Sequence, residues 1–478
     1  MKSKEKDVNK ITWNLFYYMT LHGTFGNIGN ILNYISIIYE VDIKNFVTTQ
    51  NGTSNMTISK EDVDNYAFSS FALSSIFGQL FICLIYHMLV EKYGSSLLWI
   101  NVRHYIVILA CTLMIITKFL ANPLFLTTSQ FLFGVNSFFI FPQLIFLSEC
   151  GPYNKRANVI LNTNTAYMFI NVIIITLTSK TMINYDNWHY IFVIGIIASI
   201  TYLLLVQDVK ETPKYLYFTD QNFEKINESL LFYRHDNTNV DKIIDEYETE
   251  MSMYKTKVFM SINEVMNIKG LRKRIFILFV AEISQKISLY IILNPYLEKI
   301  LNYLDVPLLY SSSVLVGIQF GGLIASALSS TVSNLFSRKR SLIAFIILSG
   351  ISFKFMFIGL VSENIVDNNV LPQILCILAI YISTIISNIG HSCMTPLLIN
   401  DIIPIHAKVA TIQILNIFSS IIQIYLIISF VPFYNFFGSV TFLNYNLIMT
   451  IAMFLIAKYL PDTKEKQVYE VFNDYEEL

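Results

Sequence analysis

The segment VAEISQKISLYI places two opposite charges inside an apolar run. Glu282 and Lys286 stand four residues apart, so on a helix they share one face, with the acid N-terminal to the base as an ion pair prefers. If this run crosses a membrane, both charges are costly there and mark a functional site. Two interpretations stay open: a structural ion pair that faces a cavity, or a charge that binds an anionic substrate group or a coupled proton.

Amide side chains interrupt other apolar runs. A neutral polyol is recognised by amides and hydroxyls that both donate and accept hydrogen bonds within an otherwise apolar cavity. Asn164 in LNTNTAYMF, Gln285 beside Lys286, and Gln319 in VGIQFGGLI are candidates for such contacts. The alternative is a hydrogen bond between helices, which is common for amides in membranes.

Residue patterns for other chemistry are missing from the sequence. No nucleophile–base or metal constellation is recognisable, and there is no nucleotide-binding glycine signature. The five cysteines have no metal-ligand spacing and are expected to be small buried hydrophobes: Cys83, Cys111, Cys150, Cys376 and Cys393. The net charge of −1 suggests no nucleic-acid partner. We therefore expect no enzyme, no metal and no cofactor.

The elements that must position these side chains are membrane-spanning helices. The chain of 478 residues is 54% hydrophobic and 14% charged, with a mean hydropathy of +0.52, whereas soluble domains carry about 25% charged residues. Twelve apolar runs are long enough to cross a hydrocarbon core of about 30 Å. They centre on residues 13–38, 68–90, 98–119, 125–148, 158–178, 189–206, 274–294, 308–332, 341–361, 373–398, 409–431 and 438–460. The predicted fold class is an all-α membrane protein with twelve transmembrane helices.

The distribution of Lys and Arg predicts the orientation. With both termini in the cytosol, 25 of the 33 basic residues fall in cytosolic segments and four in external loops. The glycosylation sequons at Asn51 and Asn55 then lie in the external loop after the first span. These sequons favour the secretory route and the plasma membrane. Arg103 and His104 in INVRHYIVI raise the same question as Glu282 and Lys286, and the favoured interpretation places them at the cytosolic interface.

A repeat relates the two halves of the chain. After the fourth span stands SECGPYNKRAN and after the tenth NDIIPIHAKVA; in both, an acid is followed by proline three residues later and a base seven residues later. Glu149 and Asp401 head these segments, 252 positions apart. Glu211 in VKETPKYL and Asp462 in YLPDTKEK are 251 positions apart. The sequence therefore predicts two six-helix halves around a midplane site that open alternately to each side.

The charges at the cytosolic ends of these helices are candidates for gating. Pairs across the halves would favour the state that is closed on that side; the alternative is interfacial anchoring and snorkelling. The candidate gating charges are Glu91, Lys92, Glu149, Arg156, Glu211, Lys214, Arg338, Lys339, Asp401 and Lys408.

These motifs resemble those of the sugar porter family of the major facilitator superfamily, in particular the animal facilitative glucose transporters, and identify a divergent member. ETPKYL is similar to the family's Pro-Glu-Ser-Pro-Arg-aromatic-Leu, and LPDTKEKQVYEVF to its Pro-Glu-Thr-Lys-Gly ending. LVEKYGSS is similar to its Asp-Arg-x-Gly-Arg-Arg. The resemblance extends from about residue 15 to 471. It implies the major facilitator fold, with short cytosolic helices in the central loop.

The resemblance also suggests roles for single residues. Asn164 occupies the position of a sugar-contacting glutamine, Gln285 matches a family sugar contact, and Lys286 stands where the family has a second glutamine. Gln319 lies one turn from a family asparagine position that is Gly322 here. Proton-coupled sugar porters carry an acid in the first helix, and LFYYMTLHGTFGNIGNILNYISII has none. A facilitative carrier is therefore favoured.

The expected organisation is a six-helix bundle in residues 1–206, a cytosolic linker in 207–273, a second bundle in 274–460 and a cytosolic tail in 461–478. The expected partners are a small solute, in the first place a monosaccharide, and the lipid bilayer, and no oligomer is required. Two alternatives to a hexose carrier remain: a carrier of another, possibly anionic, substrate, and a nutrient sensor that does not transport. The short tail argues against the sensor.

Overall fold

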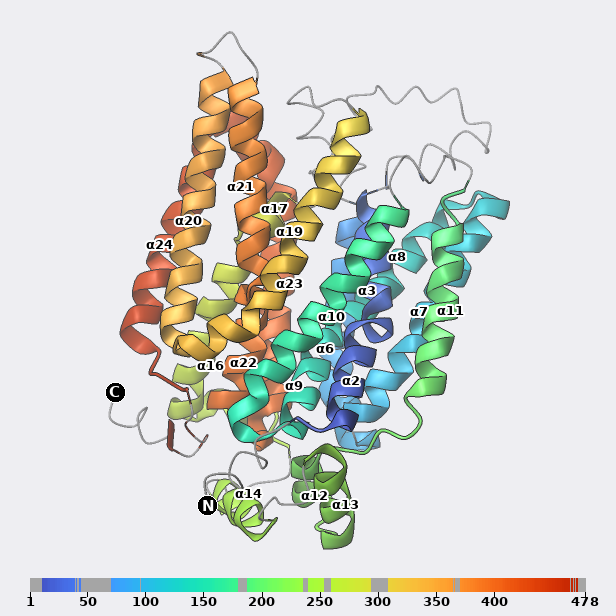
Figure 1. Ribbon diagram of the computed structural model, residues 1–478, viewed down its shortest axis with the longest axis vertical. Helices are drawn as coiled ribbons and strands as arrows, with labels where there is room; N and C mark the ends of the chain where they lie inside the picture. The colour runs from blue at the N-terminus through green and yellow to red at the C-terminus, as the bar shows by residue number, and fades with distance from the viewer. Residues whose placement is uncertain are drawn as a thin grey trace.

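The chain folds into two groups of helices that stand side by side, with a layer of short helices at one end (Figure 1). This computed structural model describes residues 11–38, 40, 43, 70–94, 96–178, 187–234, 240–252, 259–293, 308–363, 365, 370–464, 466, 468 and 470–471. Within those residues there is no β-strand. The prediction of an all-α membrane protein with twelve spans in two six-helix bundles is confirmed.

The first bundle consists of spans one to six. Their helices are α2 (Trp13–Gly23) with η1 (Phe25–Asn27) and α3 (Ile28–Ile38), α6 (Ser70–Tyr93), α7 (Ser96–Leu120), α8 (Pro123–Phe138) with α9 (Ile140–Cys150), η3 (Tyr153–Lys155) with α10 (Arg156–Leu177), and α11 (Tyr190–Leu205).

The second bundle consists of spans seven to twelve. Its helices are α16 (Lys269–Lys286) with α17 (Leu289–Leu293), α19 (Leu308–Leu335), α20 (Arg338–Glu363), α21 (Val370–Asn388) with η5 (His391–Cys393) and α22 (Met394–Ile402), α23 (Ile405–Phe437) and α24 (Val440–Tyr459). In the described part of the chain, nine helical segments are long and apolar enough to cross a membrane. The other three spans are the interrupted first and seventh and the 16-residue α11.

Four spans are broken near their middle, and the four are related by the repeat. The first breaks between α2 and η1, the fourth at Phe139, the seventh at Ile287 and Ser288, and the tenth at Ile389 and Gly390. Gly390 has φ +142°, a conformation that costs a residue with a Cβ atom considerably more than glycine. Spans one and seven, and four and ten, stand at equivalent places in the two halves. Discontinuous spans of this kind form the substrate sites of transporters.

The two bundles pack most extensively along three helix pairs. α10 packs against α19, α6 packs against α23, and α9 packs against α22. The first two pairs are long membrane helices, whereas α9 and α22 are the second parts of the broken fourth and tenth spans. Both broken and continuous helices therefore border the space between the bundles.

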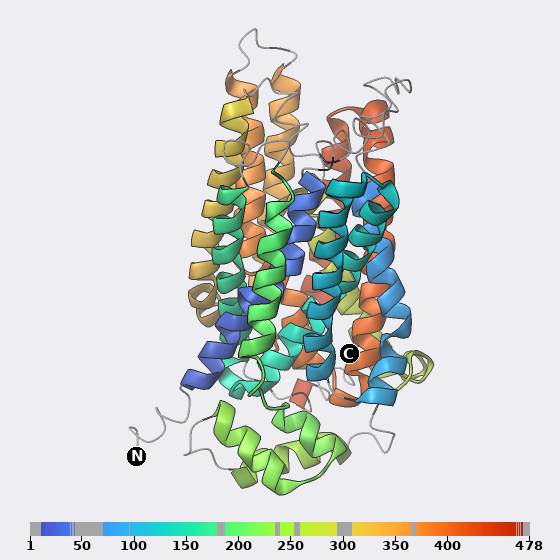
Figure 2. The same ribbon diagram turned by 90° about the vertical axis from the view of Figure 1, so that its right-hand side faces the viewer.

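The short helices lie together at one end of the bundles, which we call the cap end (Figure 2). They are α12 (Pro213–Thr219), α13 (Phe223–Tyr233) and α14 (Val240–Ser252), whereas α15 (Ile262–Asn267) packs against α16 and α23. Asn222 caps α13, and Ser261 with Glu264 forms a capping box on α15, which satisfies donors that helix starts leave open. Tyr217, Phe218 and Tyr247 pack with Ile405 of the second bundle, so the cap contacts both halves.

Arg103 and His104 differ from their expected place. Both are fully buried within the first bundle instead of lying at the interface. The reason is that α7 turns this face toward α2, α9 and α11, where polar groups of the first span's break meet it.

Candidate functional site

A cavity of about 300 Å³ lies between the two bundles at the level of the four breaks. Both halves contribute polar side chains to its wall. From the first half these are Asn27, Asn30, Gln79, Ser137, Thr163, Asn164 and Tyr167; from the second they are Gln285, Lys286, Tyr290, Ser387, Asn388 and Ser392. Ile140, Phe141, Leu144, Met168 and Pro396 add apolar surface. Amides and hydroxyls on an apolar background suit a ligand that carries many hydroxyl groups.

An asparagine network forms the wall on the first-half side. Asn30 donates to the Asn27 side chain at 3.2 Å and accepts from Asn136 at 3.0 Å. Asn27 follows the break of the first span directly, which brings the network to the level of the cavity.

Asn164 and Gln285 line the cavity from different halves. The amide of Asn164 donates to the Asn388 carbonyl at 3.4 Å, a long bond between the halves. The amide of Gln285 donates to the Ser392 carbonyl at 3.1 Å, and its carbonyl oxygen has no hydrogen-bond partner. Gln285 therefore lines the cavity, while its carbonyl oxygen is enclosed by protein and has no donor.

Lys286 and Glu282 occupy different depths. Lys286 lines the cavity, and its ammonium lies 3.5 Å from the Glu282 carboxylate. Glu282 lies behind it, 1% exposed, and accepts a hydrogen bond from Ser419 at 3.2 Å. The cation is thus the member of the pair that a solute would meet.

Gln319 is not among the residues that line the cavity. It is buried and accepts from Asn171 at 3.2 Å while donating to the Tyr34 hydroxyl at 3.2 Å. These bonds join α19 to α10 and α3. Gln319 therefore forms hydrogen bonds between helices, which was the alternative interpretation of the amides in the apolar runs.

Sequence reasoning missed two amides of the cavity wall. Gln79 on α6 lines the cavity and donates to Asn416 on α23 at 3.2 Å. Asn388 lies at the end of α21, two residues before Gly390, and its carbonyl accepts from Asn164. A single amide in an apolar run is the only signal for either residue, and it does not tell a cavity from a helix contact.

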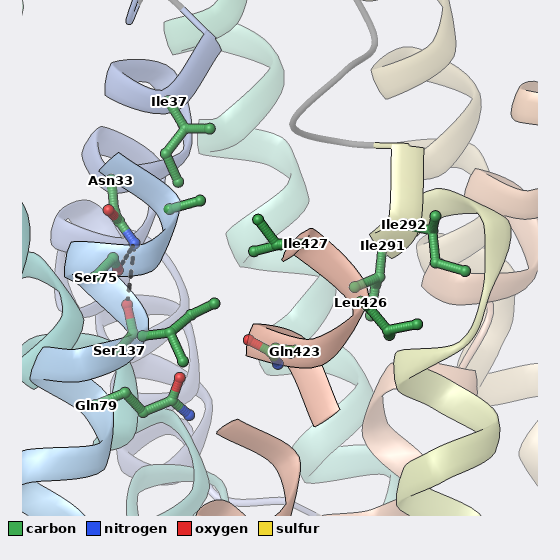
Figure 3. A pocket seen from close by; sticks show the side chains of 12 residues that line it. Asn33, Ile37, Ser75, Gln79, Ser137, Ile291, Ile292, Gln423, Leu426 and Ile427 are labelled. Carbon is green, nitrogen blue, oxygen red and sulfur yellow. Dashed lines mark hydrogen bonds between the residues drawn. The ribbon is translucent and has the colours of Figure 1, made fainter. Parts of the chain in front are cut away.

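A second cavity of about 210 Å³ continues from the first, away from the cap end (Figure 3). The two share Gln79 and Ser137. Figure 3 shows Asn33, Ser75 and Ser137 on one side and Gln423, Leu426 and Ile427 on the other. Asn33 donates to Ser75 at 2.8 Å and to Ser137 at 3.5 Å. Most of the other residues that line this second cavity are apolar, so the cavity is more suitable as a passage than as a polar binding site.

The cap end is closed by contacts between the halves. The Lys408 ammonium lies 2.5 Å from the Glu149 carboxylate, and both side chains are less than a tenth exposed. Lys408 also donates to Asn400 at 2.7 Å, and Asn400 in turn donates to Ser148 of the first half. The cavity beside these residues has a volume of only about 40 Å³. The two halves are therefore in direct contact at the cap end.

Lys214 does not pair across the halves directly. Its ammonium lies 2.6 Å from Glu250 of α14, and Glu250 also accepts from the backbone N–H of Ile405, the first residue of α23, at 3.0 Å. Burial lowers the pKa of Lys214 to about 8 although Glu250 opposes the shift. Burial alone would raise the pKa of Glu250, but Lys214, Lys408 and the hydrogen bonds leave it lowered. Through Glu250, Lys214 links the cap to the second half.

The other candidate gating charges have their close side-chain contacts within their own half, although the charges of Asp401 and Arg156 interact across the halves. Asp401 lies 3.7 Å from Arg338 and accepts from Thr463. Arg156 lies over the Tyr153 ring, and Lys92 over the Tyr93 ring. Glu91 lies 3.8 Å from His87, Glu211 borders the small cavity beside Glu149, and Lys339 is half-buried at the start of α20. Asn51 and Asn55 lie outside the described residues.

The sequence model of the family described as sugar (and other) transporter matches residues 25–475. No curated protein sequence matches the chain.

Solved structures of sugar symporters have a similar fold. The proton:xylose symporter XylE bound to 6-bromo-6-deoxy-D-glucose is 14% identical over 96% of this chain and 99% of that chain, with a TM-score of 0.78. The inward-open conformation of XylE from E. coli is 15% identical over 95% and 99%, with a TM-score of 0.64. The fucose:proton symporter FucP from E. coli is 11% identical over 93% and 98%, with a TM-score of 0.58.

Proposed function

The chain belongs to the family of sugar (and other) transporters, and on this premise we propose that it carries a hexose or a related small polyol as a facilitative carrier. It is a multi-pass membrane transporter, not an enzyme. The observation that carries the choice of substrate is the cavity between the bundles, whose wall combines amides and hydroxyls from both halves. Asn164 and Gln285 are the proposed first contacts of the solute, one from each half.

Facilitated diffusion is supported by the charges of the cavity wall. Among the described residues that line it, none is a carboxylate, and Lys286 is the one charged side chain. Proton coupling through an acid would require a carboxylate in contact with the path. Asn27 and Asn30 bind each other and Asn136 where such an acid would act.

The gating proposal rests on Glu149 and Lys408. Because they belong to different bundles and meet at the cap end, rocking the bundles apart there separates them. We assign the cap end to the cytosol from the positive charge of its segments, with residues 207–273 as the linker between the two bundles, residues 461–478 as a cytosolic tail, and Asn51 and Asn55 as external glycosylation sites. The plasma membrane is the proposed location.

Lys286 supports a second candidate, a carrier of an anionic solute. The ammonium lines the cavity and lies 3.5 Å from Glu282, longer than a close ion pair. A carboxylate or phosphate on the solute could therefore bind Lys286 from the cavity side.

The experiment is a counterflow assay in proteoliposomes with radiolabelled D-glucose, with and without a pH gradient. We expect D-glucose exchange that does not depend on the pH gradient. D-glucuronate should inhibit this exchange only weakly. Uptake that requires a pH gradient would overturn facilitated diffusion. Uptake of D-glucuronate but not of D-glucose would replace the hexose with the anionic solute.

A further inference from the structure

Arg103 is a fully buried cation without an acidic partner among the described residues. It lies on α7, inside the first bundle and outside the cavity wall. Its guanidinium donates to the backbone carbonyl of Gly26 and, at 2.5 Å, to the side-chain carbonyl of Gln143 on α9. Its other two nitrogens make no hydrogen bond. A buried charge of this kind is costly, so a plain packing role accounts poorly for it.

The acceptors of this arginine lie at the break of the first span. Gly26 belongs to η1, the short turn that joins α2 to α3. Gln143, which accepts from Arg103, donates with its amide to the carbonyl of His22 at 2.9 Å. Arg103 and Gln143 thus supply donors to one carbonyl on each side of the interruption. A break disturbs the regular N–H to C=O pattern, and backbone groups within a membrane need partners from the protein.

The backbone at the break is enclosed by three other helices. A Cβ atom placed on Gly26 would lie 3.2 Å from the Tyr202 ring on α11, 3.4 Å from the Gln143 amide and 3.5 Å from the Arg103 guanidinium. The Tyr202 hydroxyl lies 2.9 Å from His22 Nδ1. The turn is therefore fixed by side chains of α7, α9 and α11 rather than by its own hydrogen bonds alone.

The residues that follow the break reach the cavity. Asn27 is the next residue after Gly26, and it and Asn30 line the wall. All the groups that hold the break belong to the first half, so rocking the halves leaves them together. We propose that Arg103 is a positioning residue: through the Gly26 carbonyl and Gln143 it fixes the break of the first span and so the direction in which Asn27 and Asn30 meet the solute. This inference rests on the proposed function in taking the cavity as the solute site.

The test compares Arg103→Met with Arg274→Met. Arg274 is an equally buried arginine of the second half that donates to the Ile402 carbonyl at 2.9 Å and lines none of the three cavities. Loss of a buried arginine should lower the melting temperature of both variants. Only Arg103→Met should weaken D-glucose binding, by about tenfold for misplaced amide contacts, and Arg103→Lys should restore most of it because lysine also donates to carbonyls.

A second readout needs no sugar. In a Cys393→Ser background, Asn27→Cys reports whether residue 27 faces the cavity, through its rate of reaction with a small hydrophilic thiol reagent. We expect Arg103→Met to slow or speed this reaction by about tenfold and Arg274→Met to leave it unchanged, since the geometry of a site depends on its supporting contacts. If Arg103→Met yields no folded protein, Gln143→Leu replaces it with the same expectation.

The outcomes separate the two proposals. If the wild-type protein binds no D-glucose, the hexose assignment fails, and the thiol reaction still decides the role of Arg103. Unchanged glucose affinity together with an unchanged thiol rate in Arg103→Met overturns the positioning role. Equal losses of D-glucose affinity in Arg103→Met and Arg274→Met also overturn the positioning role, because they show a general effect of removing a buried arginine.

Discussion

The carboxylate of Glu149 on α9 and the ammonium of Lys408 on α23 form a buried ion pair, 2.5 Å apart, between the two bundles. Thr212 at the start of α12 donates to the same carboxylate at 3.4 Å. The pair therefore joins the first half, the second half and the cap at one point. Removing one member of a buried pair costs about 3–5 kcal/mol because the other charge stays buried without a partner.

Glu149→Gln is expected to favour the state that is open at the cap end, where water can reach Lys408. The natural Cys393 lines the central cavity and reports this opening. An impermeant thiol reagent applied from the cap side should label it about tenfold faster or more in the variant, given the size of a broken buried pair.

The exchange of both charges is the control for this prediction. Glu149→Lys with Lys408→Glu restores the attraction with its sign reversed and should return labelling toward the wild-type rate. Glu91→Gln is the second control, because Glu91 is exposed and lies near His87 of its own helix. Equal labelling in Glu149→Gln and Glu91→Gln would contradict the gating role.

Gln285→Ala should weaken D-glucose binding more than Asn164→Ala. Gln285 lines the cavity and has a buried carbonyl oxygen that no protein donor satisfies, whereas the Asn164 amide already donates to the Asn388 carbonyl. We expect losses of about tenfold and about threefold, the range of one hydrogen bond. Equilibrium binding to purified protein measures both.

Gln319→Ala is the matched control for these amides. Gln319 is buried and bonded to Asn171 and Tyr34 but does not line the cavity. Its loss should lower the melting temperature and leave the affinity unchanged. A larger loss of affinity in Gln319→Ala than in Gln285→Ala would show that the binding site lies nearer α19.

Most of the fold could be predicted from the sequence because each span has its own run of apolar residues. Twelve apolar runs predicted twelve spans, and the 252-residue offset between Glu149 and Asp401 predicted two related halves. The breaks were not predicted, because a run such as that around Phe139 stays apolar through its interruption. The hydrophobic pattern records contact with lipid or protein and not the backbone turn.

The site was less accessible to sequence reasoning. Gln285, Lys286 and Asn164 line the cavity, but the same reasoning included Gln319 and passed over Gln79 and Asn388. An amide in a membrane helix satisfies either a solute or another helix. Only the rotation of the helix decides between these, and rotation depends on tertiary packing. The same limit applies to Arg103, whose burial depends on what α7 faces.

Lys286→Gln is expected to change the preference between neutral and anionic solutes. Lys286 is the charged residue on the described cavity wall, so its removal takes away the attraction for a carboxylate. The ratio of D-glucose to D-glucuronate uptake should rise by about tenfold, the size of one charge-assisted hydrogen bond. In Lys286→Gln the Glu282 carboxylate stays buried without its cation. The double variant, Glu282→Gln with Lys286→Gln, removes this carboxylate as well and controls for its effect. An unchanged ratio in both variants would exclude Lys286 from solute selection.

The buried pair of Lys214 and Glu250 predicts how pH affects the cap. Because the pKa of Glu250 is lowered from 4.5 in the folded protein, its contribution to the free energy of unfolding is present above pH 4.5 and is lost as the pH falls through the lowered value. Lys214 behaves differently. Its pKa is lowered from 10.5 to about 8, so the buried ammonium opposes folding below pH 8, and this opposition fades between pH 8 and 10.5.

Thermal unfolding in detergent at several pH values tests this linkage. The wild-type melting temperature should fall on acidification below pH 4.5, and Glu250→Gln should be less stable at pH 7 but lack that part of the acid dependence. Glu228→Gln is the matched control, since Glu228 pairs with Lys210 at the exposed surface of the cap, where ion pairs contribute little. If Glu250→Gln and Glu228→Gln retain the same acid dependence as the wild type, the acid transition arises elsewhere, and the Lys214–Glu250 pair does not control the docking of α14 on Ile405.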